Sequence, residues 1–153
     1  MGSDFVGREA ELALLAQQMD AAAQGTGSVV LLTGPAGIGK STLAAEALRR
    51  RAGPAGIGIV RGHCPRDAVA PPLWPWRRAL RLAGAGAWAT AALPAQRAGT
   101  PPPGAGTATA RAAAAAARFL ELAAMAEALA DAAAANGRGL VVVLEDLHWA
   151  DAA

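Results

Sequence analysis

Eight residues near the start of the chain combine the types that bind phosphate. Residues 34–41 read Gly-Pro-Ala-Gly-Ile-Gly-Lys-Ser and match the pattern G-x-x-x-x-G-K-[S/T]. Its glycines permit backbone conformations in which successive N–H groups point at phosphate oxygens. Lys40 supplies a positive charge for the β- and γ-phosphates, and the Ser41 hydroxyl is a ligand for Mg²⁺. The pattern predicts a P-loop that binds a nucleoside triphosphate, and ATP with Mg²⁺ is the expected ligand.

The whole loop and the first turn after it are assigned to the nucleotide. Thr42 is included by its position, which suits the α-phosphate. The assigned residues are Gly34, Pro35, Ala36, Gly37, Ile38, Gly39, Lys40, Ser41 and Thr42.

A second copy of the glycine pattern serves as an internal comparison. Residues 53–58 repeat the first six residues of the loop letter for letter, but Ile59 and Val60 follow where the loop has Lys40 and Ser41. This copy also precedes an apolar run, whereas a P-loop follows one. It therefore lacks the charge and the metal ligand, and we expect a helix-to-strand turn that binds no phosphate.

Two acidic residues follow an apolar run near the C-terminus. Residues 140–144 are Leu-Val-Val-Val-Leu, and Glu145 and Asp146 come next. Enzymes with a P-loop use such acids to hold Mg²⁺ and to orient the attacking water. The segment therefore reads as a Walker B motif in which both carboxylates are candidate catalytic groups and metal ligands. We favour Glu145 for the metal and Asp146 for the water, and the division of roles stays open.

Alternating helices and strands must position these groups. Residues 29–32 form a short apolar run whose composition predicts a strand buried on both faces of a parallel sheet. The order favours an α/β fold with a parallel sheet flanked by helices. The predicted helices span residues 8–23, 40–51, a short stretch ending near 83, and 109–135; the predicted strands span 29–32, 57–61 and 140–144; residues 62–72 are a loop, and 84–107 are an Ala/Gly/Pro-rich insertion.

Composition excludes several classes of protein. Hydrophobic residues make up 54% of the 153 residues, but many are alanine, and the net charge is only +2 with scattered arginines, so no nucleic-acid footprint is expected. The single cysteine, Cys64, rules out a disulfide framework and beside His63 forms no metal-site pattern, so a buried thiol is expected. Without a signal peptide or a membrane span of ~20 apolar residues, the chain is expected to be cytoplasmic.

Four segments together resemble one family. Residues 5–9 (Phe-Val-Gly-Arg-Glu), the P-loop with its following threonine, residues 70–76 and residues 145–151 (Glu-Asp-Leu-His-Trp-Ala-Asp) are similar to AAA-related, STAND-type ATPase modules. The last segment resembles the extended Walker B of large ATP-binding regulators of the LuxR type. The resemblance covers the chain apart from residues 84–117. It implies that Val6, Gly7 and Arg8 lie near the adenine.

The resemblance also implies an incomplete domain. Family sheets have the strand order 5-1-4-3-2, and the three predicted strands correspond to strands 1, 2 and 3. Strand 1 is then expected to lack a neighbour or to pair wrongly with strand 3. The chain is expected to be the N-terminal portion of an ATPase domain without strands 4 and 5. Its expected parts are residues 1–27, a lead-in helix; 28–61, strand, P-loop, helix and strand; 62–83, a Trp-rich segment; 84–107, the insertion; and 108–153, a helix and the Walker B strand.

The implied activity is ATP binding and hydrolysis as a switch in a bacterial signalling or transcription regulator. Its partners would be ATP and, in a full-length parent, DNA through an absent C-terminal domain, together with self-association; no membrane partner is expected. The chain alone is expected to bind ATP weakly and to hydrolyse it poorly. Two alternatives stay open: a non-catalytic nucleotide-binding or interaction module from a truncated product, and a P-loop kinase for a small molecule. Against the kinase, the sequence shows no arginine-rich lid.

Overall fold

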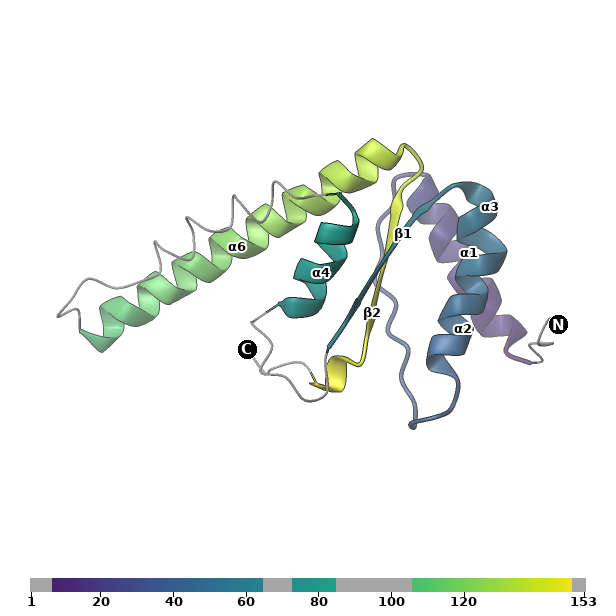
Figure 1. Ribbon diagram of the computed structural model, residues 1–153, viewed down its shortest axis with the longest axis horizontal. Coiled ribbons are helices and arrows are strands. Elements are labelled where there is room, and N and C mark those ends of the chain that lie inside the picture. The colour runs from purple at the N-terminus through teal and green to yellow at the C-terminus, as the bar shows by residue number, and fades with distance from the viewer. Residues whose placement is uncertain (1–6, 65–72, 85–105, 150–153) are drawn as a thin grey trace.

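The computed structural model describes residues 7–64, 73–84 and 106–149. These residues form a two-stranded parallel sheet with helices on both sides (Figure 1). The elements are α1 (Glu9–Ala23), α2 (Lys40–Ala47), the π-helical turn η1 (Leu48–Ala52), α3 (Gly53–Ala55), β1 (Gly58–His63), α4 (Trp74–Leu82), α6 (Thr107–Asn136), β2 (Leu140–Glu145) and the 3₁₀ turn η2 (Leu147–Trp149).

The sheet pairs the second and third strands that the sequence predicts. Gly58 lies opposite Leu140, and the register runs to His63 opposite Glu145. Parallel strands need a crossover connection, and here α4 and α6 lie between the two strands in the sequence. The parallel pairing and the flanking helices confirm an α/β arrangement, which is incomplete because only two strands pair in the described part of the chain.

One face of the sheet packs against α1 and α2. Val141 and Val143 of β2 lie against a buried cluster that these helices supply with η1 and the residue before β1. The members of this first cluster are Leu12, Met19, Leu43, Ala47, Leu48, Ala52 and Ile57. The cluster fixes α1 to the same core as α2, which directly follows the P-loop.

The opposite face packs against α4 at very close range. A Cβ atom added to Gly62 on β1 would lie 2.1 Å from the carbonyl oxygen of Pro75. Only glycine therefore allows the backbone of α4 to approach the strand this closely. A second buried cluster, formed by Leu80, Met125 and Ala128, then joins α4 to α6, and Trp76 packs on it.

An ion pair reinforces the contact between α4 and α6. Arg77 on α4 donates to Glu121 on α6, whose side chain is buried. Toward its N-terminus, α6 carries no buried residue before Glu121 and extends away from the sheet (Figure 1). Its 30 residues span about 45 Å. No helix in the described ranges is long and apolar enough to cross a membrane.

The prediction of a buried strand at residues 29–32 is wrong for this structure. The segment is not paired with either strand, and the side chains of Val29 and Leu31 are 98% and 74% exposed. Leu32 alone packs against the first cluster. A strand needs a neighbour to satisfy its backbone, and an apolar run does not supply one. The expectation that this segment lacks a neighbour is confirmed.

The remaining elements differ from their predictions mainly in their ends. The predicted helix over residues 40–51 is α2 continued by one π-helical turn, and the second glycine copy is the helix-to-strand turn that was expected, with α3 ending before β1. Predicted features on Val6, on Ala150 and Asp151, and on residues 85–105 of the insertion lie outside the described residues.

Candidate functional site

The backbone of residues 34–41 has the conformation that its glycines allow. Gly34, Gly37 and Gly39 have φ angles of 146°, 76° and 90°, a region that residues with a side chain rarely adopt. α2 begins at Lys40, directly after this loop. The first N–H groups of a helix have no acceptor within the helix, and they carry the positive end of its dipole. The loop and the start of α2 therefore form a site suited to an anion.

The side chain of Lys40 turns back onto this loop. Its Nζ donates to the carbonyl oxygens of Gly34 and Pro35, each at 3.0 Å. The ammonium group is thus held beside the loop by its own backbone. Ser41 and Thr42 in the first turn of α2 are exposed, so the hydroxyl groups predicted to face the metal and the α-phosphate are open to a ligand.

Arg8 contacts the same loop although it lies 30 positions before Ile38 in the sequence. It precedes α1, and its Nη2 donates to the carbonyl oxygen of Ile38 at 2.5 Å. Its backbone is left-handed, with φ 61°, and it follows Gly7 with φ 85°. Of the residues predicted near the adenine, Arg8 therefore lies at the P-loop, Gly7 lies next to it, and Val6 is outside the described residues.

A hollow of about 380 Å³ lies between α1, residues 30–33 and the P-loop. A volume of this order suits a small ligand. Arg8 and Lys40 contribute positive charge to its wall, and most of the remaining wall is apolar. The other described lining residues are Glu11, Leu14, Leu15, Val30, Leu31, Leu32, Thr33, Ile38 and Leu43.

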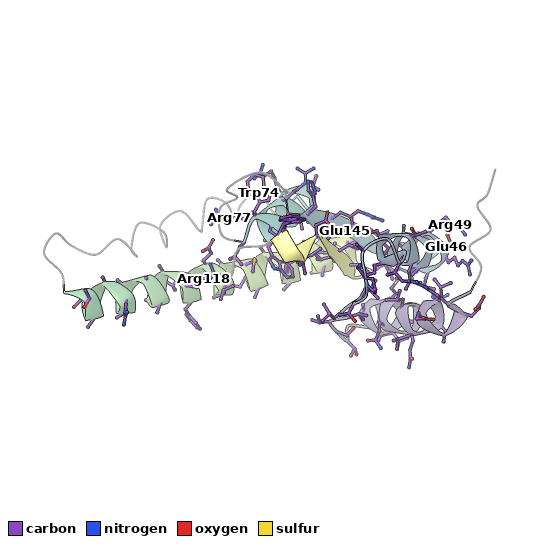
Figure 2. The ribbon with its side chains drawn as sticks, turned by 90° about the horizontal axis from the view of Figure 1, so that it is seen from below. Glu46, Arg49, Trp74, Arg77, Arg118 and Glu145 are labelled. Atoms are coloured by element: carbon purple, nitrogen blue, oxygen red, sulfur yellow. The ribbon has the colours of Figure 1, made fainter. Side chains whose placement is uncertain are left out.

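The acidic pair lies at the C-terminal end of β2. Glu145 is half-buried, Asp146 is exposed, and Asp146 adopts a left-handed backbone with φ 58°. Neither residue is among the described residues that line the hollow. The structure thus brings Arg8 and Lys40 together but leaves the two carboxylates outside the hollow. Figure 2 shows Glu145 between α2 and the helix that carries Trp74.

Arg61 is a neighbour of Glu145 that the sequence analysis missed. Its Nη1 lies 3.8 Å from Oε2 of Glu145. Arg61 pairs with Val143, two residues before Glu145, so the alternation of side chains in a strand puts both on one face. This alternation is the signal that could have found Arg61, but it required the register of β1 against β2.

A cluster of charged side chains lies away from the P-loop, towards the end of α2. Arg49 and Arg50 both donate to Glu46, and Figure 2 shows the facing side chains of Glu46 and Arg49. The hydrogen bond from Arg49, the largest effect, and that from Arg50 together lower the pKa of Glu46 to about 2. Arg51 pairs with Asp20 on α1, and the hydrogen bond that Arg51 donates to Asp20 raises the pKa of Arg51. The Arg51–Asp20 pair thus ties η1 to α1.

Metal ligation by protein side chains alone has no support in the described ranges. Within them, no three His, Cys, Asp or Glu side chains form a group that could hold a metal ion. Cys64 is buried, as the sequence analysis expected. Mg²⁺ is commonly held by one or two carboxylates together with substrate phosphates, so this finding is compatible with a nucleotide-bound Mg²⁺.

The fold and the glycine loop define an incomplete α/β domain with a P-loop. A family model described as an AAA ATPase domain matches residues 4–153. The chain therefore belongs to the AAA ATPase domain family, a class of nucleotide-binding and nucleotide-hydrolysing domains. A comparison with curated proteins found no match, and neither did a comparison with solved structures.

Proposed function

We propose that residues 34–42 bind the phosphates of ATP with Mg²⁺. One observation carries this proposal: Lys40 Nζ lies within a loop whose three glycines have positive φ angles and which leads directly into α2. Lys40 attracts the β- and γ-phosphates, and the free N–H groups of the loop and of α2 donate to phosphate oxygens.

The oxygen ligands that the chain offers also suit Mg²⁺. Mg²⁺ prefers oxygen ligands, and Ser41 offers a hydroxyl in the first turn of α2 while Glu145 and Asp146 offer carboxylates at the end of β2. When bound, Mg²⁺ would neutralise charge on the β- and γ-phosphates. We assign Glu145 to the metal and Asp146 to the orientation of the attacking water.

For the base, we propose the side of the site next to Gly7 and Arg8, together with Val6. The hollow beside these residues supports this proposal, because its wall includes the apolar side chains of Leu14, Leu15 and Val30. An apolar wall next to a phosphate-binding loop suits a nucleobase joined to a polyphosphate.

We further propose that the chain is the N-terminal portion of an ATPase switch of a bacterial signalling or transcription regulator, of the STAND and LuxR-related type. DNA would then be contacted through another domain, and the switch would self-associate. The unpaired, exposed segment 29–32 supports a further strand that lies between this segment and β2. Such a strand would pair with segment 29–32 on one side and with β2 on the other. It would thereby align the carboxylates at the end of β2 with the P-loop.

Calorimetric titration of the chain with ATP·Mg²⁺ tests the site. We expect weak binding by the wild type and none by Lys40→Ala, because the point charge for the β- and γ-phosphates is lost. Arg111→Ala, which removes one positive charge from the exposed outer part of α6, should bind like the wild type. Equal binding by Lys40→Ala and the wild type would contradict the proposed phosphate site. Micromolar binding with steady turnover by the wild type would contradict the proposal that the domain is incomplete.

A non-catalytic nucleotide-binding module is the second candidate. It is favoured by the position of Glu145 and Asp146 outside the hollow and by the pairing of Glu145 with Arg61. Phosphate release separates the two functions: a non-catalytic module binds ATP at Lys40 without releasing phosphate above the rate of Lys40→Ala.

A further inference from the structure

Arg8 occupies a backbone conformation in which glycine would be less strained. Its φ of 61° and ψ of 32° are left-handed, a region that is costly for a residue with a Cβ atom. Such strained residues concentrate at functional sites, where the surroundings hold them in place. The strain at Arg8 therefore indicates that its side chain has a function.

The side chain of Arg8 holds one peptide group of the P-loop. Its Nη2 donates to the carbonyl oxygen of Ile38, in the peptide that joins Ile38 to Gly39. Gly37 and Gly39, with φ 76° and 90°, lie on either side of Ile38. This peptide turns about ψ of Ile38 and φ of Gly39, and a glycine offers little steric resistance on its side, so the peptide can turn over at low cost unless another group holds it.

Holding this carbonyl also orients an N–H group. In a planar trans peptide the C=O and the N–H point in opposite directions. Because the Ile38 carbonyl points at Arg8, the Gly39 N–H points away from Arg8. Gly39 directly precedes Lys40 and α2, so its N–H belongs to the set of donors available to a phosphate.

Arg8 is itself fixed to the core. Its carbonyl oxygen accepts the N–H of Leu12 at 2.9 Å in the first turn of α1. Leu12 is buried in the cluster that also contains Leu43 of α2. α1 and α2 therefore share one core, and Arg8, directly before α1, contacts the loop from a fixed position.

We propose that Arg8 is a positioning residue of the phosphate site, which acts through the Ile38 carbonyl to keep the Gly39 N–H available to a phosphate oxygen. This inference rests on the proposed function. It gives the side chain of Arg8 a role on the phosphates, distinct from contact with the adenine.

Titration with two ligands distinguishes a role of Arg8 on the phosphates from a role on the adenine. Wild type, Arg8→Gly, Arg8→Ala, Arg8→Lys and Arg111→Ala are titrated with ATP·Mg²⁺ and with inorganic tripolyphosphate·Mg²⁺, which has no base. We expect Arg8→Gly and Arg8→Ala to weaken both ligands by the same factor, roughly tenfold as for one charge-assisted hydrogen bond. Arg8→Lys should recover part of the loss, and Arg111→Ala should lose none. Loss of ATP affinity with unchanged tripolyphosphate affinity would overturn the proposal in favour of a role on the base.

Thermal unfolding separates positioning from folding. Arg8→Gly relieves the left-handed strain, so its Tm should be no lower than that of Arg111→Ala, whereas Arg8→Ala keeps the strain and should melt below Arg8→Gly. Equal affinities for the two variants despite different Tm values would tie the loss of binding to the missing guanidinium. An affinity loss that follows Tm would instead overturn the positioning role.

A measurement without nucleotide keeps this inference distinct from the proposed function. In ¹⁵N NMR of the free chain, Arg8→Gly should broaden or shift the Gly39 amide signal, and Arg111→Ala should leave it unchanged. An unchanged Gly39 signal in Arg8→Gly overturns the inference even if Lys40 proves essential for ATP. If the wild type binds neither ligand, the proposed function fails, and the NMR comparison still decides whether Arg8 holds the loop.

Discussion

Arg61 on β1 and Glu145 on β2 share one face of the parallel sheet, with Nη1 and Oε2 3.8 Å apart. The Arg61 side chain is 45% exposed, so the pair contributes little to folding, about 0 to 1 kcal/mol. Its consequence is local: a positive charge stands beside the carboxylate that we assign to Mg²⁺. On that assignment, Arg61 would compete with a metal ion for the Glu145 carboxylate.

Replacing Arg61 by Ala should favour metal-dependent ATP binding. Removing the competing charge should lower the Mg²⁺ concentration for half-maximal ATP binding by about twofold to fivefold, the equivalent of a surface ion pair. Calorimetric titrations with ATP at a series of Mg²⁺ concentrations measure this shift. Arg78→Ala, on the exposed side of α4, is the matched control, and an unchanged Mg²⁺ dependence in Arg61→Ala would argue against Glu145 as a metal ligand.

The unpaired segment 29–32 should promote self-association. Val29 is 98% exposed within a segment that has no strand partner, and exposed apolar edges pair with other chains. Val29→Lys should reduce association in sedimentation velocity and change the free energy of unfolding by no more than about 0.5 kcal/mol. Leu82→Lys removes an exposed apolar side chain from α4 instead, and an equal reduction by this control would show that the edge is not responsible.

The close approach of α4 to β1 predicts a severe effect of one methyl group. In Gly62→Ala the new Cβ would lie 2.1 Å from the oxygen and 2.8 Å from the carbon of the Pro75 carbonyl, and neither backbone atom can move without shifting α4. We expect a loss of about 3 kcal/mol in the free energy of unfolding, measured with urea. Gly106→Ala, at the open N-terminal end of α6, should cost far less, and similar losses for both variants would refute the close contact.

Glu46 should make the free energy of unfolding depend on pH below pH 4.5, the ordinary pKa of its carboxyl group. Its pKa is lowered from 4.5 to about 2 by hydrogen bonds from Arg49 and Arg50, so the ionised form is favoured in the folded chain. The resulting stabilisation is complete above pH 4.5 and is lost as the pH falls from 4.5 towards about 2.

Glu46→Gln should lose less stability than the wild type over this pH range, since it has no carboxylate to protonate. Tm values measured at intervals from pH 6 to pH 2 test this, with Glu127→Gln on the exposed surface of α6 as the control. Parallel pH profiles for Glu46→Gln and the wild type would contradict the prediction.

Local patterns predicted the paired strands and the helices closely. The predicted strand at 140–144 is Leu140–Glu145, and the predicted helix at 109–135 is Thr107–Asn136. Both segments carry their own signal, an apolar run for a strand and helix-forming residues ended by a glycine for a helix. The same rule failed at residues 29–32, because a strand depends on a neighbour that lies elsewhere in the sequence.

The sequence by itself predicted the phosphate chemistry of residues 34–41, because residue types at fixed spacing within one segment suffice for that pattern. It also determined that the second glycine copy is a turn, since Lys40 and Ser41 have no counterpart there. Only the tertiary structure decided that Arg8 holds the Ile38 carbonyl, that Arg61 stands beside Glu145, and that the acidic pair lies outside the hollow. The first two relationships join residues 30 and 84 positions apart, and all three depend on how helices and strands pack, which no local pattern records.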